Sequence, residues 1–214
     1  MDTIPCPVCR APGVGPFGTF EGRRYLRCPT CRATLLDPAQ HPDLATEKAQ
    51  YDLHRNDPAD PRYRAFLNRL AAPLRARLAP GAEGLDYGCG PGPALAAMLA
   101  EAGHPMAMWD PIYAPDPAPL ARRYDFVTCT EVAEHLHRPA DSFDAMCALV
   151  RPGGWLGIMT CFQTDDAAFE RWHYRLDPTH VAFYRRETLA HLASLRRWRF
   201  ESPAKDIVLM QRPA

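Results

Sequence analysis

The 214-residue sequence lacks a net charge, a long apolar run and an export signal in its first residues. Basic and acidic residues number 25 each, so no overall field favours nucleic acid or an anionic membrane. No apolar stretch approaches the roughly 18 residues of a membrane-spanning helix, and MDTIPCPVCR lacks the basic-then-apolar signal pattern. We therefore expect a soluble cytoplasmic protein with no membrane partner. Its oligomeric state stays unknown from the sequence.

Four of the eight cysteines form two C-x-x-C pairs, CPVC and CPTC. A disulfide framework is not expected without an export signal. Two such pairs at this spacing can supply the four-thiolate shell of a structural zinc, whereas a redox pair needs only one. The predicted ligands are Cys6, Cys9, Cys28 and Cys31. The stretch between the pairs reads as a hairpin, and so short a unit needs its metal to fold.

The rest of the chain divides by composition into a linker and a larger domain. We assign residues 1–36 to a zinc ribbon, 37–78 to a linker with lid helices, and 79–214 to the main domain. Strand and helix patterns alternate along the main domain, which predicts an α/β fold with a doubly wound, mostly parallel sheet. Ligands of such sheets bind at the carboxyl ends of the strands.

The glycine-rich stretch DYGCGPG, residues 86–92, follows a predicted strand and opens a predicted helix. Its glycines allow a close approach of the backbone to a ligand. Asp110 ends the next strand, about twenty residues on, where an acid can bind ribose hydroxyls. The third glycine comes one residue too early for the dinucleotide fingerprint G-x-G-x-x-G. That spacing disfavours, without excluding, a nicotinamide-dependent oxidoreductase.

Together DYGCGPG, the acid of WDP, EVAEHL and LVRPGGWLGIMT resemble the class I S-adenosylmethionine-dependent methyltransferases. The resemblance covers roughly 79–214 and implies a Rossmann-like, seven-stranded-type sheet with S-adenosylmethionine as cofactor. It implies these cofactor-binding residues: Asp86, Gly88, Cys89 and Gly90 for the methionine half, Asp110 for the ribose, and Thr130 nearby. Only about thirteen residues separate Asp110 from the next strand. We therefore expect one strand to be missing, and Asp116 or a neighbour is only a guess for the adenine contact.

The segment EVAEH places Glu131, Glu134 and His135 at a spacing that would share one helical face. It is similar to the metal-binding segment of small-RNA terminal 2′-O-methyltransferases and ubiquinone-biosynthesis O-methyltransferases. The RNA enzymes add a later histidine, which would be His180 here. Such ligands suit Mg²⁺, Mn²⁺ or Zn²⁺, and the ion would lower the pKa of paired acceptor hydroxyls.

A reading without this second metal stays open, in which the glutamates cap a helix or contact the cofactor. Then His135 or His180 is the best general base, because imidazole titrates near neutral pH. The candidate catalytic residues are Glu134, His135 and His180. Weaker candidates for the pocket come from the linker and from the insertion after the predicted strand WLGIMT: Tyr51, His54, Asn56, Trp172, His173, Tyr174 and Asp177.

The sequence thus predicts a methyltransferase that transfers a methyl group from S-adenosylmethionine to an unidentified acceptor. The expected acceptor is a hydroxyl of a small molecule, with an RNA terminus as the second choice. Transfer to nitrogen or carbon stays open. The alternative from another class is a catalytically inactive zinc-ribbon module that binds nucleic acid or protein, which the intact glycine turn disfavours.

Overall fold

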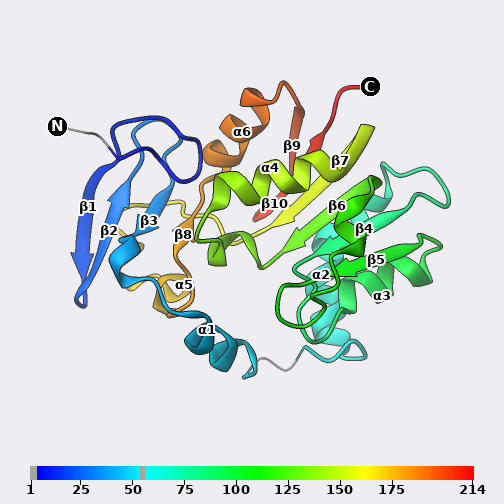
Figure 1. Ribbon diagram of the computed structural model, residues 1–214, viewed down its shortest axis with the longest axis horizontal. Helices are drawn as coiled ribbons and strands as arrows, with labels where there is room; N and C mark the ends of the chain where they lie inside the picture. Colours follow the sequence, from blue (N-terminus) through cyan, green and yellow to red (C-terminus); the bar gives the residue numbers. More distant parts are fainter. Residues whose placement is uncertain (1–3, 54–55) are drawn as a thin grey trace.

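A six-stranded sheet forms the centre of the main domain in the computed structural model, which describes residues 4–53 and 56–214 (Figure 1). The strands, in sheet order, are β5 (Met106–Trp109), β4 (Gly84–Tyr87), β6 (Tyr124–Thr130), β7 (Val150–Met159), β10 (Ile207–Gln211) and β9 (Arg199–Ala204). The first four are parallel to one another. β10 runs antiparallel to β7, and β9 runs antiparallel to β10, so only β10 opposes the direction of the other five strands. The predicted doubly wound, mostly parallel sheet is confirmed.

One strand of the seven-stranded pattern is absent between β5 and β6, as expected from the short connection. Within the described chain, residues 111–123 carry only the 3-10 turn η2 (Ala118–Ala121) and an isolated bridge between Asp110 and Ala114. The connection is too short for a helix and a further strand, so β5 remains an edge strand.

The chain has six helices in its described part, and four of them, α2 and α3 on one face and α4 and α6 on the other, cover this sheet. Their bounds are α1 (Leu44–Tyr51), α2 (Pro61–Arg75), α3 (Ala94–Glu101), α4 (Pro139–Leu149), α5 (His173–Leu176) and α6 (Arg186–Leu195). Further 3-10 turns are η1 (Pro38–Gln40), η3 (Ala133–His135) and η4 (Phe169–Arg171). No helix within 4–53 and 56–214 is both long and apolar enough to span a membrane.

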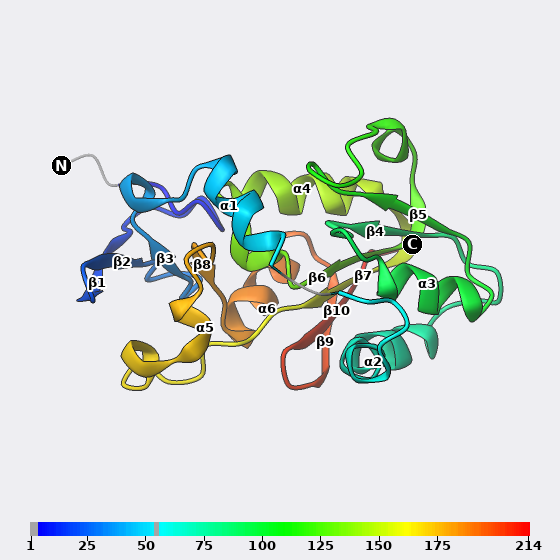
Figure 2. The same ribbon diagram turned by 90° about the horizontal axis from the view of Figure 1, so that it is seen from below.

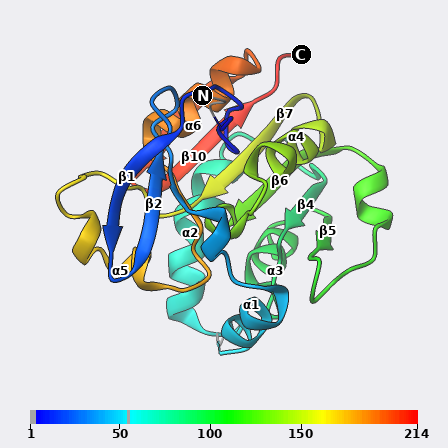
Figure 3. The same ribbon diagram turned by 60° about the vertical axis from the view of Figure 1, so that its left-hand side comes forward.

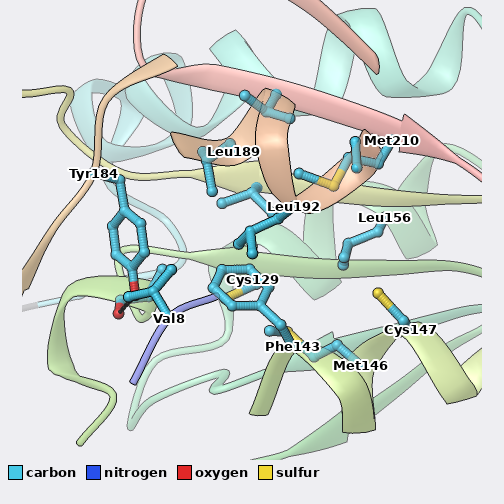
Figure 4. Packing of buried hydrophobic residues seen from close by; sticks show 14 of the residues in the cluster. Val8, Cys129, Phe143, Met146, Cys147, Leu156, Tyr184, Leu189, Leu192 and Met210 are labelled. Atoms are coloured by element: carbon cyan, nitrogen blue, oxygen red, sulfur yellow. Dashed lines mark hydrogen bonds between the residues drawn. The ribbon is translucent and has the colours of Figure 1, made fainter. Parts of the chain in front are cut away.

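Successive side chains of a strand point to opposite faces of the sheet, so one sheet can pack against two layers of helices. Val208 and Met210 of β10 face the core that includes α4 and α6, whereas Ile207 and Leu209 face α2 and α3. Figure 4 shows the first of these cores, in which Val8 of the N-terminal segment packs with side chains of the main domain. The apolar N-terminal contact joins the ribbon to the main core.

The N-terminal segment forms a second, four-stranded sheet with a strand from the main domain. Its order is β1 (Gly15–Phe20), β2 (Arg23–Arg27), β3 (Thr34–Leu36) and β8 (Ala182–Phe183). β1 and β2 form the predicted hairpin. Figures 1 and 2 show these strands at one end of the molecule, beside α5. The boundaries 1–36 and 37–78 stay predictions.

The segment after the ribbon returns the chain to the main sheet through α1, as Figure 3 shows. Asp43 caps α1 by accepting the Thr46 N–H at 2.8 Å. Side-chain contacts link the helix to the main domain: the Tyr113 hydroxyl donates to Asp52 at 2.7 Å, and His137 lies 2.8 Å from Glu47. No residue of α1 is fully buried, so these polar contacts help to hold the helix against the main domain.

Candidate active site

One cavity of about 540 Å³ opens at the carboxyl ends of β4, β5 and β6. It is lined by all ten predicted site residues other than the four zinc-ligand cysteines: Asp86, Gly88, Cys89, Gly90, Asp110, Thr130, Glu131, Glu134, His135 and His180. Each group follows a different strand, and parallel strands bring their carboxyl ends to one edge of the sheet. The structure therefore gathers residues from distant parts of the sequence in a single pocket.

The glycine turn after β4 has a backbone that side chains would disturb. Gly88 has φ +78°, and a Cβ there would lie 2.5 Å from Cγ2 of Val132. Its N–H donates to the Trp109 carbonyl at 2.7 Å. Gly90 also has a positive φ, +62°, but open space at its Cβ position. The backbone conformation therefore favours glycine at both positions, and close packing against Val132 adds to this at Gly88.

Asp110 fixes this turn against the end of β5. One carboxylate oxygen accepts the Gly90 N–H at 3.0 Å, and the other accepts the N–H groups of Ile112 and Tyr113 at 2.8 and 2.9 Å. Ile112 and Tyr113 line the cavity, whereas Asp116 does not. Asp116 instead accepts the Ala118 N–H at 3.0 Å. The position of Ile112 and Tyr113 depends on the loop that Asp110 folds, and the residue that contacts adenine stays a prediction.

Asp86 is a buried acid in the same half of the cavity. Its carboxylate accepts the Thr128 hydroxyl at 2.7 Å. Burial raises the pKa of Asp86 to about 6, with a further contribution from the charge of Asp110. Burial, with the charges of Asp86 and Asp110, also raises the pKa of Cys89 to about 12, so that side chain stays a thiol at neutral pH.

The EVAEH segment is folded differently from the helical face that its spacing suggested. Glu131 has φ +51° and precedes the single 3-10 turn η3, so it does not share a helical turn with Glu134 and His135. Glu134, His135 and His180 each place one potential ligand atom within 4.8 Å of the others. Glu131 is outside this group. The structure brings three of the four predicted second-metal ligands together and leaves Glu131 beside them.

The Tyr174 hydroxyl links the two glutamates. It donates to Oε1 of Glu134 and lies 3.5 Å from Oε2 of Glu131. Glu134 is fully buried, and its second oxygen accepts the Thr160 hydroxyl at 3.0 Å. Burial and the nearby charge of Glu134 raise the pKa of Glu131. These contacts orient Glu134, which the sequence could not show because Tyr174 and Thr160 are distant in the chain.

The two histidines are oriented alike: Nδ1 of each ring faces a backbone carbonyl, which leaves Nε2 for the cluster. Nδ1 of His135 lies 3.2 Å from the Thr179 carbonyl, and Nδ1 of His180 lies 2.7 Å from the Tyr174 carbonyl. A carbonyl only accepts, so Nδ1 carries the proton and Nε2 keeps its lone pair. Burial lowers the pKa of His180, which favours the neutral ring. Each histidine can thus serve as a metal ligand or accept a proton through Nε2.

The structure places some of the weaker pocket candidates at the cavity and others away from it. Asp177 lines the cavity, with its carboxylate 4.0 Å from Nε2 of His180. Tyr51 of α1 lies with its ring 5.1 Å from that of His135, and Asn56 also lines the cavity. His173 is exposed and, like Trp172, is not a lining residue. His54 lies outside the described residues.

The four predicted zinc ligands form a second cluster, away from the cavity. Sγ of Cys6 is 3.7 Å from Sγ of Cys31, and Sγ of Cys9 is 3.7 Å from Sγ of Cys28. Zinc–sulfur bonds of about 2.3 Å in a tetrahedron separate the sulfurs by about 3.8 Å. Equivalent backbone hydrogen bonds close the two C-x-x-C turns: the Arg10 N–H donates to the Cys6 carbonyl at 2.8 Å, and the Arg32 N–H donates to the Cys28 carbonyl at 3.0 Å. The donor set and spacing fit a structural zinc.

Comparison with known proteins identifies the family. The methyltransferase domain family matches residues 51–199, which is more than half of the chain. The chain therefore belongs to the methyltransferase domain family. The ubiquinone biosynthesis O-methyltransferase of Leptothrix cholodnii is 50% identical over 38 residues, which cover 18% of this chain and 16% of that protein. A similar enzyme of Burkholderia multivorans is 51% identical over 37 residues, again 16% of its length. These local matches leave most of both chains unaligned.

Solved structures share the fold of this methyltransferase-domain protein at low identity. One is the 1,6-didemethyltoxoflavin-N1-methyltransferase of Burkholderia thailandensis with bound 1,6-didemethyltoxoflavin and S-adenosylhomocysteine. The match covers 94% of this chain and 100% of that chain, at 19% identity and TM-score 0.54. Another is the magnesium protoporphyrin IX methyltransferase of Synechocystis with bound S-adenosylhomocysteine. The match covers 70% of this chain and 83% of that chain, at 17% identity and TM-score 0.52. Both likenesses support the predicted methyltransferase fold.

Proposed function

We propose that the protein is an S-adenosylmethionine-dependent methyltransferase with a small-molecule acceptor. The observation that carries the proposal is the single cavity shared by the glycine turn, Asp110 and the Glu134–His135–His180 cluster. In this arrangement the cofactor occupies the side of Asp86 and Gly88, and its methyl group points toward the cluster. The two structural neighbours with bound S-adenosylhomocysteine support the choice of cofactor.

The acceptor in this proposal is a hydroxyl of a small molecule. The cavity has the size of a small-molecule site, and it must also hold the cofactor. Local identity to ubiquinone biosynthesis O-methyltransferases supports transfer to oxygen. A neutral hydroxyl is a weak nucleophile, so the reaction needs a group that removes or stabilises its charge. Nε2 of His135 or His180 can accept the proton from an acceptor placed beside the cluster.

We further propose that Glu134, His135 and His180 bind a second divalent cation, with Glu131 or Asp177 near enough to complete the site. Carboxylate oxygens and the free Nε2 atoms match the ligand preferences of Mn²⁺ or Zn²⁺. Such an ion would lower the pKa of an acceptor hydroxyl. The chain's contribution is orientation: Tyr174 and Thr160 hold Glu134, and backbone carbonyls hold both imidazole rings. The ribbon cysteines hold a structural zinc in the same proposal.

Labelled S-adenosylmethionine tests this function with a panel of small hydroxylated and catechol-like metabolites. Glu134→Gln and His180→Ala should lower methyl transfer by about 100-fold or more, while cofactor affinity changes by less than about twofold. His173→Ala is the matched control, because His173 belongs to the same insertion but is exposed and outside the cavity. Zinc content is measured in every variant. Full activity in both cluster variants would refute the assigned role of the cluster.

A further inference from the structure

A side chain of the ribbon holds the loop that carries His180. The Arg23 guanidinium donates from Nη1 to the carbonyls of Arg175 at 2.9 Å and Asp177 at 3.3 Å. From Nη2 it donates to the carbonyls of Pro178 at 3.5 Å and His180 at 3.3 Å. One side chain of β2 thus contacts four carbonyls within six consecutive residues of another part of the chain.

We propose that Arg23 is a positioning residue for His180, and that the zinc ribbon braces the acceptor end of the active site. The inference rests on the proposed function of the Glu134–His135–His180 cluster. It gives the ribbon a task within its own chain, in place of docking to nucleic acid or to another protein.

Backbone pairing connects the ribbon to the same loop independently of Arg23. Thr34 and Leu35 of β3 pair with Phe183 and Ala182 of β8, directly after the loop. The Leu36 N–H donates to the Val181 carbonyl at 2.8 Å, and the Val181 N–H donates to the carbonyl of Glu134, also at 2.8 Å. A chain of backbone hydrogen bonds therefore runs from β3, through the residue after His180, to the residue before His135.

Aromatic packing fixes the other end of the loop against the ribbon. Phe169, Phe183 and Tyr174 form one buried cluster with Tyr25 of β2. The ring of Tyr25 lies 5.0 Å from that of Phe169, edge to face. Tyr174, whose hydroxyl donates to Glu134, is held in this cluster. The packing thus fixes Tyr174, a second group of the site, through ribbon side chains.

Arg175 of α5 makes a second link between the ribbon and the loop that carries His180. Its side chain is only 1% exposed, and it donates to Glu21 in the turn between β1 and β2 at 2.9 Å. It also donates to the Glu170 carbonyl at 2.6 Å. Arg23 and Arg175 therefore form reciprocal contacts, each reaching from one segment to the other. Neither reaches the cavity, so any effect on catalysis must pass through the loop.

Arginine is suited to this task because its planar fork offers five N–H donors in fixed directions. A lysine ammonium at the same position has three donors on a flexible stem and cannot reach all four carbonyls at once. Without the clamp, the loop can shift His180 relative to Glu134 and His135. A displacement of about 1 Å in a catalytic constellation can lower the rate by about 100-fold.

The test compares Arg23→Ala, Arg23→Lys and Arg24→Ala in the full chain. Arg24 is the matched control, since it neighbours Arg23 on β2 but its side chain is 55% exposed and pairs with Asp37 on the surface. The first readout is the ring-proton NMR signals of His180, assigned by their loss in His180→Ala. The rings of Tyr174 and His135, at 4.1 and 4.7 Å, shift these signals in the intact site.

We expect Arg23→Ala to move the His180 signals toward those of an unstructured histidine, with zinc content unchanged. Methyl transfer should fall by about 10- to 100-fold at nearly constant cofactor affinity. Arg23→Lys should retain part of both properties, and Arg24→Ala should match the unmodified protein. Unchanged His180 signals in a folded, zinc-loaded Arg23→Ala protein would overturn the inference. If the unmodified protein transfers no methyl group, the proposed function fails, while the NMR comparison still decides the role of Arg23.

Discussion

From the proposed cofactor site, we expect the buried acid Asp86 to make the affinity for S-adenosylmethionine depend on pH. Burial raises the pKa of Asp86 to about 6 in the cofactor-free protein. S-adenosylmethionine carries a sulfonium and an ammonium group, so its binding favours the ionised carboxylate beside it. A group that must lose a proton before the ligand binds weakens the observed affinity as the pH falls through its pKa. We therefore expect constant affinity above about pH 7 and a decline below pH 6.

The size of the effect follows from this pKa. At pH 5, a carboxyl group with a pKa of about 6 is ionised in only about one molecule in eleven. If the complex holds Asp86 ionised throughout, the association constant at pH 5 is about tenfold lower than at pH 8. This factor corresponds to about 1.4 kcal/mol of binding free energy. Each further decrease of one pH unit should weaken binding by another factor of about ten, down to the pH at which the protein unfolds.

Calorimetric titration with S-adenosylmethionine between pH 5 and pH 8 measures this dependence. Asp86→Asn supplies the control, because the amide oxygen can still accept the Thr128 hydroxyl that Asp86 accepts at 2.7 Å. The variant should bind the cofactor more weakly, with an affinity that no longer changes across this range. A flat profile in the unmodified protein, with its fold intact at pH 5, would refute the placement of Asp86 beside the cationic cofactor.

Three further perturbations test the turn, the acceptor end and the ribbon. Gly88→Ala should lower the free energy of unfolding, measured by chemical denaturation, by about 1–2 kcal/mol or more, because Gly88 has a positive φ and lies close to Val132. Adding Val132→Ala should recover part of this loss. An equally stable Gly88→Ala protein would contradict this geometry. Tyr174→Phe removes the donor to Glu134 and should weaken Mn²⁺ binding by about 10- to 100-fold in an EPR titration, whereas unchanged affinity would exclude that role. Cys28→Ser should lose the ribbon zinc by elemental analysis and lower the melting temperature of the whole chain; retained zinc would place the metal elsewhere.

Features that depend on neighbouring residues could be predicted from the sequence. The paired C-x-x-C turns, the glycine turn after β4 and the missing strand after β5 all follow from short spacings in the chain. Such spacings limit the local backbone to few conformations, so the pattern and the structure agree. The placement of Asp110 at the end of β5 also follows, because an apolar run ends there at a loop.

Features that depend on the folding of distant segments could not be predicted in the same way. The spacing of EVAEH suggested a helical face, but the positive φ of Glu131 turns the chain before η3 begins. No sequence pattern indicates that Arg23 reaches four backbone carbonyls, since carbonyls carry no residue identity. The role of Tyr174 was hidden for a related reason, because its partner Glu134 comes forty residues earlier.

Isothermal titration of the purified protein with S-adenosylmethionine and, separately, with NADH tests the central claim most directly. The cavity of the glycine turn and Asp110 should bind S-adenosylmethionine at one site per chain, with a dissociation constant on the order of micromolar, and should not bind NADH. The affinity should fall in Asp110→Asn, which changes the group that accepts the Gly90 N–H at 3.0 Å. Saturable binding of NADH without binding of S-adenosylmethionine would contradict the account.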